Sequence, residues 1–260
     1  MEKMRFTKMH GLGNDYVYVD CFSERVSDPQ MLSVRLSDRH KGIGSDGLVL
    51  IMPSEVADFR MRIFNADGSE AEMCGNASRC IGKYVYEHGL TSKKCITLET
   101  LSGVKSLQLF VEEGSVVSVR VNMGIANIIG ERSCWGRKYA LVNIGNPHAV
   151  CFVDDVYDID VLSEGSMMDK SVDGGVNVEF VEVVSRKELK MRVWERGSGE
   201  TMACGTGACA SAVAAINANL TENKVTVHLA GGDLQIEQTA GGTIMMTGGA
   251  TEVFSGEIDI

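Results

Sequence analysis

Two cysteines occupy the same place in two copies of one sequence pattern. Residues 60–75 and 190–205 align without a gap, and both copies end in Cys-Gly, at Cys74 and Cys204. The offset is constant at 130 residues (204 − 74), and the identical pairs across it are Met61/Met191, Arg62/Arg192, Glu70/Glu200, Cys74/Cys204 and Gly75/Gly205. Each half of the chain therefore carries one thiol in an equivalent setting.

The elements expected around the two cysteines are equivalent too. Residues 60–64 and 189–194 alternate apolar with polar side chains, which is typical of half-buried strands, and each stretch leads into a loop rich in Gly, Ser and Glu. A helix is expected after each Cys-Gly, over residues 76–87 and over residues 206–219. Gly89 is expected to cap the C-terminus of the first helix. A sulfur at a helix N-terminus faces unpaired backbone N–H groups, which favour the thiolate and can also hold a carboxylate.

Two such thiols suit one type of reaction. If they flank a single carbon, a thiolate on one side can remove a proton while a thiol on the other side delivers one. With backbone donors gripping an adjacent carboxylate, this predicts racemisation or epimerisation at the α-carbon of an amino acid. The sequence contains no Gly-rich dinucleotide fingerprint, P-loop, HExxH or paired CxxC zinc pattern, so we expect neither a cofactor nor a metal.

The repeat also predicts the domain organisation. Gly13-Asn14 is answered by Gly145-Asn146, in the same order as the cysteine blocks, which indicates a duplication. Two copies are too few for a solenoid, so we expect two similar domains about a pseudo-two-fold axis, with equivalent loops meeting at a cleft. A hairpin signal within residues 111–130 indicates where the first domain ends.

The composition is that of an ordinary globular protein, with 44% hydrophobic and 23% charged residues and a net charge of −10. This charge leaves no electrostatic footprint for nucleic acid or an anionic membrane, so we expect a small-molecule partner. The start of the chain lacks the apolar region of a signal peptide, and no run approaches the length of a membrane span. We therefore expect a cytoplasmic protein with no membrane partner.

The eight cysteines are expected to be reduced thiols in that compartment. Four of them lie among apolar or small residues, and we expect these in the core: Cys80, Cys95, Cys151 and Cys209. Cys74 and Cys204 differ from these four in standing at a helix start.

Six blocks of the sequence resemble the signature blocks of diaminopimelate epimerase. They cover residues 11–16, 39–47, 64–76, 145–148, 177–181 and 195–208, and the resemblance runs from Phe6 to Glu257. It implies an α+β fold of two similar domains, each a curved, mostly antiparallel sheet around a central helix, with the final strand returning to the first domain. Together with the hairpin signal, this gives an N-terminal domain of residues 1–118 plus 251–260 and a C-terminal domain of residues 119–250.

The resemblance also implies an activity and a site. The family is cofactor-independent, forms homodimers, and interconverts LL- and meso-diaminopimelate in lysine and peptidoglycan precursor biosynthesis. By position, Cys74 and Cys204 are the acid/base pair, and Glu195 and His148 are expected to modulate the protonation of the thiols. The residues expected to hold the substrate are Asn14, Asn65, Gly75, Asn76, Asn146, Asn177, Glu195, Arg196, Gly205 and Thr206.

Plainer interpretations remain open for several of these residues. Arg196 could form a solvated ion pair with Glu200, the asparagines beside glycine could be turn formers, and His148 could hold a loop. For the whole chain, the alternatives are a racemase of another amino acid, for instance histidine, on the same fold, or a thiol/disulfide redox or binding protein that uses Cys74 and Cys204.

A few positions depart from the pattern of the family. Ala77 and Ser78 stand where Gly-Ala is common, Gly47 stands where some members have Gln, and Phe254 replaces a Tyr associated with the dimer contact. These departures bear on the substrate pocket and the dimer rather than on the thiols.

Overall fold

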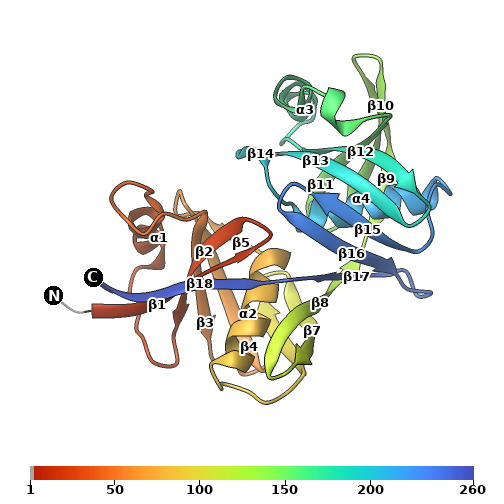
Figure 1. Ribbon diagram of the computed structural model, residues 1–260. Coiled ribbons are helices and arrows are strands. Elements are labelled where there is room, and N and C mark those ends of the chain that lie inside the picture. Colours follow the sequence, from red (N-terminus) through yellow and green to blue (C-terminus); the bar gives the residue numbers. More distant parts are fainter. Residues whose placement is uncertain (1–2) are drawn as a thin grey trace. The chain divides into compact units, whose positions relative to one another are not determined.

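The computed structural model describes residues 3–260, which form two compact units (Figure 1). Unit 1 consists of Met1–Val121 and Gly248–Ile260, and unit 2 consists of Asn122–Thr247. The first domain expected from the sequence ends at residue 118 and resumes at 251, whereas unit 1 ends at residue 121 and resumes at 248.

Unit 1 is a mixed sheet with two helices. In spatial order its strands run β18-β1-β2-β3-β4-β6-β7-β8, and β5 pairs with the far end of β4. The pairs β2–β3 and β4–β6 are parallel and the others are antiparallel. The elements are β1 (Lys3–Gly11), β2 (Asn14–Asp20), α1 (Pro29–Ser37), β3 (Gly47–Met52), β4 (Phe59–Asn65), β5 (Glu70–Ala71), α2 (Gly75–Glu87), β6 (Cys95–Thr100), β7 (Gly103–Glu112), β8 (Ser115–Ile125) and β18 (Thr251–Asp259).

Unit 2 repeats this topology. Its strands run β9-β10-β11-β12-β13-β15-β16-β17 with β14 paired to β13, and the parallel pairs are β11–β12 and β13–β15. Element for element, β10 to β17 therefore answer β1 to β8, and β9 takes the edge place that β18 has in unit 1. The elements are β9 (Asn127–Cys134), β10 (Arg137–Asn143), β11 (Pro147–Val153), η1 (Val156–Asp158), α3 (Val161–Lys170), β12 (Asn177–Ser185), β13 (Glu188–Glu195), β14 (Gly199–Thr201), α4 (Gly205–Asn217), β15 (Lys224–Leu229), β16 (Gly232–Gln238) and β17 (Thr243–Gly248).

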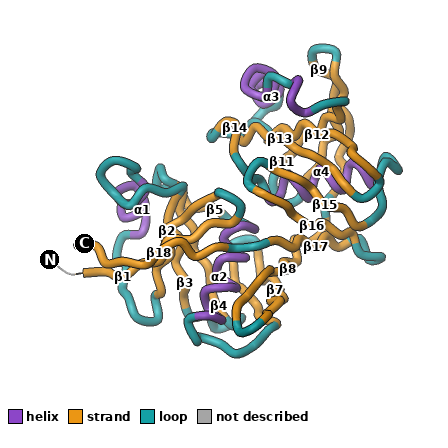
Figure 2. Tube along the Cα trace, in the orientation of Figure 1, coloured by secondary structure: helices purple, strands orange, loops and turns teal. Residues whose placement is uncertain are grey.

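Each sheet curves around one 13-residue helix, α2 in unit 1 and α4 in unit 2. Helix α2 packs on β1 and β18 near one end of the strand order and on β7 near the other, which requires the sheet to bend. Figure 2 shows each helix in purple among orange strands. Small side chains allow this close wrapping, and the alanines of α4 that are buried are Ala208, Ala210, Ala212, Ala214 and Ala215.

The α+β fold expected from the sequence is confirmed, and so are the strand before and the helix after each Cys-Gly. Both helices begin at the glycine itself, one residue before the expected start. Helix α4 ends at Asn217 rather than at residue 219, and Gly89, with φ 73°, follows the cap residue His88 of α2.

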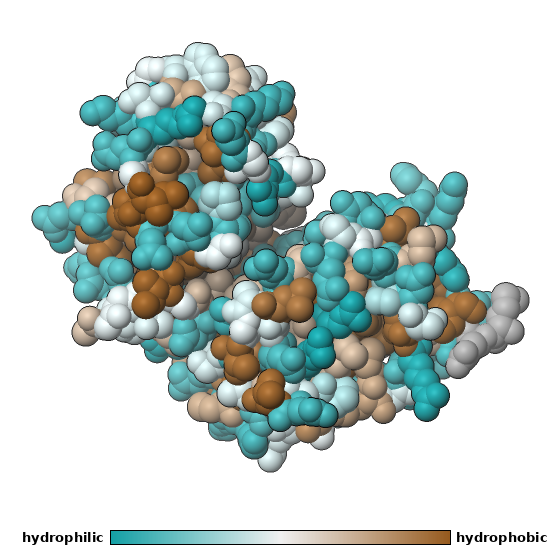
Figure 3. Space-filling model, turned by 180° about the vertical axis from the view of Figure 1, so that it is seen from behind, coloured by the Kyte–Doolittle hydropathy of each residue, from teal (hydrophilic) through white to brown (hydrophobic). Residues whose placement is uncertain are grey.

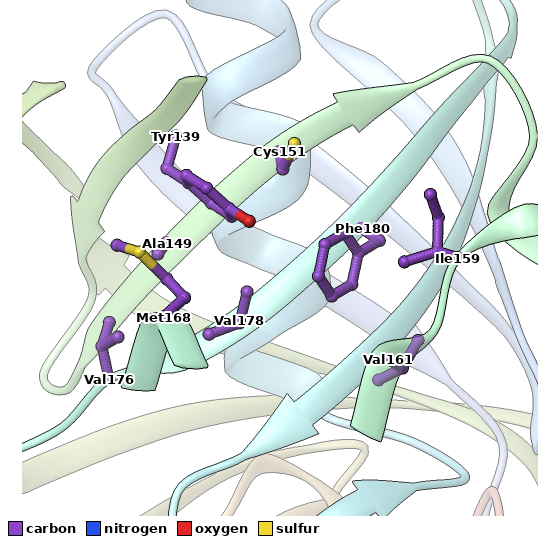
Figure 4. Packing of buried hydrophobic residues seen from close by; sticks show 9 residues of the cluster. All are labelled: Tyr139, Ala149, Cys151, Ile159, Val161, Met168, Val176, Val178 and Phe180. Carbon is purple, nitrogen blue, oxygen red and sulfur yellow. The ribbon is translucent and has the colours of Figure 1, made fainter. Parts of the chain in front are cut away.

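A second layer covers the outer face of the sheet in unit 2. Tyr139 and Ala149, from β10 and β11, pack with Phe180 of β12 against Met168 of α3 (Figure 4). In unit 1 the corresponding core joins Leu36 of α1 to the sheet residues Met4, Phe6, Val17, Val19, Leu48, Leu50 and Phe64. The two faces of each sheet are thus used differently, with the central helix on one and a short helix on the other.

The structure tests the expected burial of the four cysteines that the sequence places in the core. Cys80, Cys151 and Cys209 are buried, as expected, and all eight cysteines are free thiols. The prediction for Cys95 is wrong, because Cys95 is the first residue of β6 and is exposed. The residues around Cys95 alternate along a strand, and Cys95 points to the solvent side while its neighbour Ile96 points inward.

Exposed apolar side chains are distributed over the surface in groups. Figure 3 shows several such groups in brown, separated by hydrophilic residues in teal, with a larger one on unit 2. Exposed apolar residues of unit 2 include Ile129, Trp135 and Tyr157. Among residues 3–260, we find no helix with the length and apolar character needed to cross a lipid bilayer.

Gly47 provides a test of how tightly the sheet of unit 1 is built. It begins β3 opposite Asn65, and a Cβ atom placed on it would lie 2.0 Å from the backbone oxygen of Phe64. We predict that Gly47→Ala lowers the free energy of unfolding by about 1–3 kcal/mol, since backbone cannot yield as a side chain can. Urea denaturation measures this loss. Gly249→Ala is the control, because its added methyl meets no atom within 4 Å. Equal stability of the two variants would contradict the packing described.

Candidate active site

Cys74 and Cys204 are the N-cap residues of the two central helices. Their backbone is extended, with φ −137° and ψ 119° at Cys74 and φ −123° and ψ 110° at Cys204. Cys74 Sγ accepts the N–H of Ala77 at 3.5 Å, and Cys204 Sγ accepts the N–H of Gly207 at 3.4 Å. The sulfur thus takes the place of the oxygen that usually caps a helix, and it faces the positive end of the helix dipole.

Two equivalent ion pairs shape the hairpins that lead to the cysteines. Arg62 of β4 grips Glu70 with two hydrogen bonds of 2.7 and 2.9 Å, and Arg192 of β13 grips Glu200 with bonds of 2.8 and 3.1 Å. Paired, fork-like contacts of this kind fix geometry as well as charge. They also bear on the plainer interpretation of Arg196 that the sequence left open, an ion pair with Glu200, because Glu200 pairs with Arg192 instead.

In unit 1, polar side chains gather around Cys74. Asn14 Oδ1 accepts from Asn76 Nδ2 at 3.1 Å and lies 3.6 Å from Cys74 Sγ, while Asn14 Nδ2 donates to Asp46 Oδ2 at 2.9 Å. Arg79, which is fully buried, donates from Nη2 to Asn76 Oδ1 at 2.8 Å. Because a carboxylate can only accept and a guanidinium can only donate, these two groups fix the direction of both amides. The amide oxygen of Asn14 therefore points at the sulfur.

Asn65 lies apart from this group in its contacts. It is the last residue of β4, and its Nδ2 donates to Ser69 Oγ at 2.9 Å within the following turn. The turn-forming interpretation therefore describes the observed contacts of Asn65.

In unit 2, a continuous chain of side chains ends at Cys204. Thr206 Oγ1 lies 3.6 Å from Cys204 Sγ and 3.3 Å from Asn146 Nδ2. Asn146 Oδ1 lies 3.0 Å from His148 Nε2, and His148 Nδ1 lies 2.7 Å from Glu179 Oε1. The side chains of His148 and Glu179 are fully buried. His148 therefore belongs to the thiol's own hydrogen-bond chain and is more than a loop anchor.

Three other residues expected at the site of unit 2 lie at the start of β12, at the end of β13 and directly after it. Asn177 begins β12 next to His148 of β11, and its Oδ1 accepts the N–H of Arg196 at 2.9 Å. The Arg196 side chain is exposed and donates to the carbonyl of Gly174 at 2.6 Å. Glu195 accepts a short hydrogen bond from the Thr201 hydroxyl.

The electrostatics of unit 2 favour the neutral form of its thiol. Burial raises the pKa of Cys204 well above its ordinary value, the carboxylates of Glu195 and Glu179 act in the same direction, and hydrogen bonds from Thr206 and Gly207 oppose them. Burial also raises the pKa of the Glu195 carboxyl, against hydrogen bonds from the Thr201 hydroxyl and the Cys204 thiol. In this state Cys204 therefore holds its proton and Glu195 accepts a hydrogen bond from it.

Three residues of these groups had no role in the sequence analysis: Asp46, Arg79 and Glu179. Two of them carry a weak signal. Arg79 is a cation within the buried stretch of α2, and Glu179 is an acid between Val178 and Phe180 of β12. Buried charged groups persist in proteins only when they are paired, so a charge inside an apolar run marks a partner elsewhere in the chain. The identity of that partner is not readable from one sequence.

The arrangement can perform acid–base chemistry. Each unit offers one thiol at a helix N-terminus, and the N–H groups of the first helical turn, at Gly75 and Asn76 and at Gly205 and Thr206, are those that an α-helix leaves without intrahelical partners. Such N–H groups bind carboxylates.

Known structures share this architecture. A hydroxyproline epimerase from Agrobacterium vitis matches with a TM-score of 0.78 at 14% identity, over 99% of this chain and 91% of that one. A probable proline racemase from Agrobacterium radiobacter K84 matches with a TM-score of 0.78 at 15% identity, over 99% and 93%. A PhzF-family phenazine biosynthesis protein from Bacillus anthracis matches equally well at 17% identity, over the whole of both chains. Fold and site together define a duplicated α+β protein that shares the fold of these structures and that has a cysteine at the start of each of its two central helices.

The sequence comparisons narrow this class. The family model of diaminopimelate epimerase matches residues 6–129 and 140–253, and the chain belongs to that family. A diaminopimelate epimerase from Agathobacter rectalis is 53% identical, over 99% of this chain and all of that relative. Those from Acetivibrio thermocellus and Bacteroides thetaiotaomicron are 50% and 51% identical, over 99% of this chain and 99% and 98% of theirs. The family resemblance expected from the sequence is confirmed.

The raised pKa of Glu195 gives a test of its buried environment. A carboxyl group with a raised pKa in the folded state binds its proton more tightly there than in the unfolded chain, so ionisation destabilises the fold as pH rises through that pKa. We predict that Glu195→Gln gains stability relative to the unaltered protein between about pH 4 and about pH 8. Urea denaturation at both pH values measures the difference. The matched control is Glu188→Gln, which makes the same substitution on a side chain that is exposed at the start of β13. A constant difference for Glu195→Gln would refute the assignment.

Proposed function

We propose that the protein is a cofactor-independent epimerase that interconverts LL- and meso-diaminopimelate, an isomerase of lysine and peptidoglycan precursor biosynthesis. The observation that carries this proposal is the pair of free thiols, Cys74 and Cys204, each capping the central helix of one duplicated unit. Membership of the diaminopimelate epimerase family supports the choice of substrate.

The proposed reaction moves one proton at each face of the α-carbon. One cysteine enters as the thiolate and takes the α-proton, forming an S–H bond as the C–H bond breaks. The electron pair left on carbon is delocalised into the adjacent carboxylate, which the first-turn N–H groups stabilise. The other thiol then gives its proton to the opposite face of the carbon. The configuration is inverted, the two cysteines have exchanged protonation states, and no external oxidant or cofactor is consumed.

The remaining roles are part of the proposal. Gly75, Asn76, Gly205 and Thr206 supply donors to the carboxylate at the reacting centre. Glu195 binds the reacting amino group, which its half-buried carboxylate suits. The distal, unchanged end of the substrate is held by Asn14, Asn65, Asn146, Asn177 and Arg196, of which Arg196 offers an exposed guanidinium able to grip a second carboxylate.

We also propose that the protein is a cytoplasmic homodimer. Reduced thiols suit the cytoplasm, and the edge strand β18 carries Val253 and Phe254 with more than two-fifths of each residue's surface exposed (54% and 47%), which an interface between copies would cover. Sedimentation equilibrium measures the mass of the assembly, and a monomer at all concentrations would contradict the dimer.

Deuterium exchange tests the activity and the substrate together. Purified protein in D₂O, with no added cofactor, is expected to place deuterium at the α-carbon of LL-diaminopimelate as it forms the meso isomer. The same incubation with other L-amino acids, histidine among them, is expected to give none. Exchange confined to another amino acid would replace the proposed substrate, and an absence of exchange with every amino acid under reducing conditions would refute the epimerase.

Single substitutions test the two-thiol assignment. We predict that Cys74→Ala and Cys204→Ala each lower the rate of epimerisation by at least about 10²–10⁴-fold, because neither remaining thiol can reach both faces of the carbon. Circular dichroism should show an unchanged fold. Cys95→Ala is the control, since Cys95 is exposed at the start of β6 and lies outside the proposed site. Near-normal turnover in either active-site variant would exclude a two-base reaction.

A further inference from the structure

The chain of side chains that ends at Cys204 has a direction, which can be worked out from its donors and acceptors. When Cys204 is a thiolate, its sulfur only accepts, so the Thr206 hydroxyl must donate to it. The Thr206 oxygen is then free to accept from Asn146 Nδ2, which lies 3.3 Å away. This turns the Asn146 oxygen toward His148 Nε2, at 3.0 Å, and Nε2 must carry a hydrogen.

The Asn146 amide keeps this direction when Cys204 holds its proton, because its Nδ2 faces Thr206 and its Oδ1 faces His148, and the direction fixes the number of protons on the buried pair of His148 and Glu179. Nε2 is committed to Asn146, and the 2.7 Å contact between His148 Nδ1 and Glu179 Oε1 needs a hydrogen of its own. The pair therefore carries two protons, either as imidazolium with carboxylate or as neutral imidazole with carboxylic acid. Both forms have no net charge.

The surroundings of the pair agree with a net charge of zero. Both side chains are fully buried, and a buried charge without compensation is costly. Glu179 Oε2 has no hydrogen-bond partner among residues 3–260, so a lone carboxylate would be poorly satisfied there. Glu179 is also wedged against the helix start, since a Cβ atom on Gly207 would lie 2.6 Å from its Oε1. This close packing restricts the carboxyl group next to the N-terminus of α4, which Cys204 caps.

We propose that Glu179 is a positioning residue of the epimerase. Through His148 and Asn146, it fixes the direction of the hydrogen bonds so that the Thr206 hydroxyl donates to the sulfur of Cys204. The charged groups that face the sulfur are the carboxylates of Glu195 and Glu179, and the donation from Thr206 opposes their effect. This inference rests on the proposed function only in taking Cys204 as an acid/base group, and it assigns roles to Glu179 and Asn146 that substrate binding does not require.

Alkylation of Cys204 tests the direction of the chain without any substrate. In a Cys74→Ala background, the rate of reaction with iodoacetamide at fixed pH follows the thiolate fraction of Cys204, and peptide mass spectrometry separates it from Cys95, the exposed thiol that serves as internal reference. Thr206→Val removes the donor at constant shape and should slow the reaction about tenfold, as expected for one pKa unit. Thr206→Ser keeps the hydroxyl and should leave the rate within about twofold. Equal rates in the valine and serine variants would overturn the proposal.

Asn146→Asp reverses the direction of the chain. An aspartate accepts from both neighbours, so the Thr206 hydroxyl turns toward residue 146 and away from the sulfur. The substitution should slow alkylation about tenfold more when Thr206 is present than in the Thr206→Val background, where its added charge alone acts. Equal slowing in both backgrounds, or none in either, would overturn the proposal.

The state of His148 gives a further measurement, made on the Cys74→Ala protein with and without Glu179→Gln. Nitrogen-15 NMR of the imidazole should show a hydrogen on Nε2. Glu179→Gln should change the Nδ1 signal more than the Nε2 signal, because residue 179 contacts Nδ1. An Nε2 atom without hydrogen at neutral pH would overturn the proposal whatever the folding of the variants. Deuterium exchange into diaminopimelate by the unaltered protein reports the function separately, so the two hypotheses can fail independently.

Discussion

The capping of each central helix by a cysteine sulfur is the interaction on which the site depends. It places a polarisable, ionisable atom where the backbone would otherwise leave N–H groups unsatisfied, and it leaves the N–H groups at the helix start for a ligand. The fold serves this arrangement directly. A sheet that bends around one helix buries nearly all of that helix, so the helix cannot drift relative to the strand and hairpin that deliver the cysteine. The Arg62–Glu70 and Arg192–Glu200 pairs fix those hairpins in both units.

The two units share the same helix-capping cysteine but differ in the polar group that faces its sulfur. In unit 1 an amide oxygen, on Asn14, faces the sulfur, whereas in unit 2 a hydroxyl, on Thr206, occupies that place. An amide oxygen can only accept, so it favours the protonated thiol, while a hydroxyl can also donate to a thiolate. Asn76 and Thr206 stand at equivalent positions of the repeat, so one side-chain difference gives the two thiols unlike neighbours. A reaction that runs in both directions needs two groups that can exchange roles, and unlike neighbours let each be adjusted separately.

Sequence reasoning reached the elements that short-range patterns specify. The strand, the loop, the Cys-Gly and the helix follow one another in each half, because alternation, turn residues and helix starts are local signals. It failed where the answer depends on which side of a strand a residue faces or on a partner in another element. Cys95 begins a strand in which sides alternate, and the pleat turns it outward. Arg196 stands four residues before Glu200, yet the hairpin brings Glu200 to Arg192 instead. Glu179 was visible only as an acid in an apolar run, since its partner, His148, belongs to another strand.

The edge strand β18 ties the last residues of the chain to the first, because Thr251–Asp259 pairs with β1 along most of its length. Unit 2 lies wholly within the intervening sequence, so all its strands are made before β18 is made. Unit 1 lacks one edge of its sheet until β18 has been synthesised. During translation, therefore, the later-made half can finish folding first, and β1 waits as an open template that a premature stop codon would leave permanently uncovered.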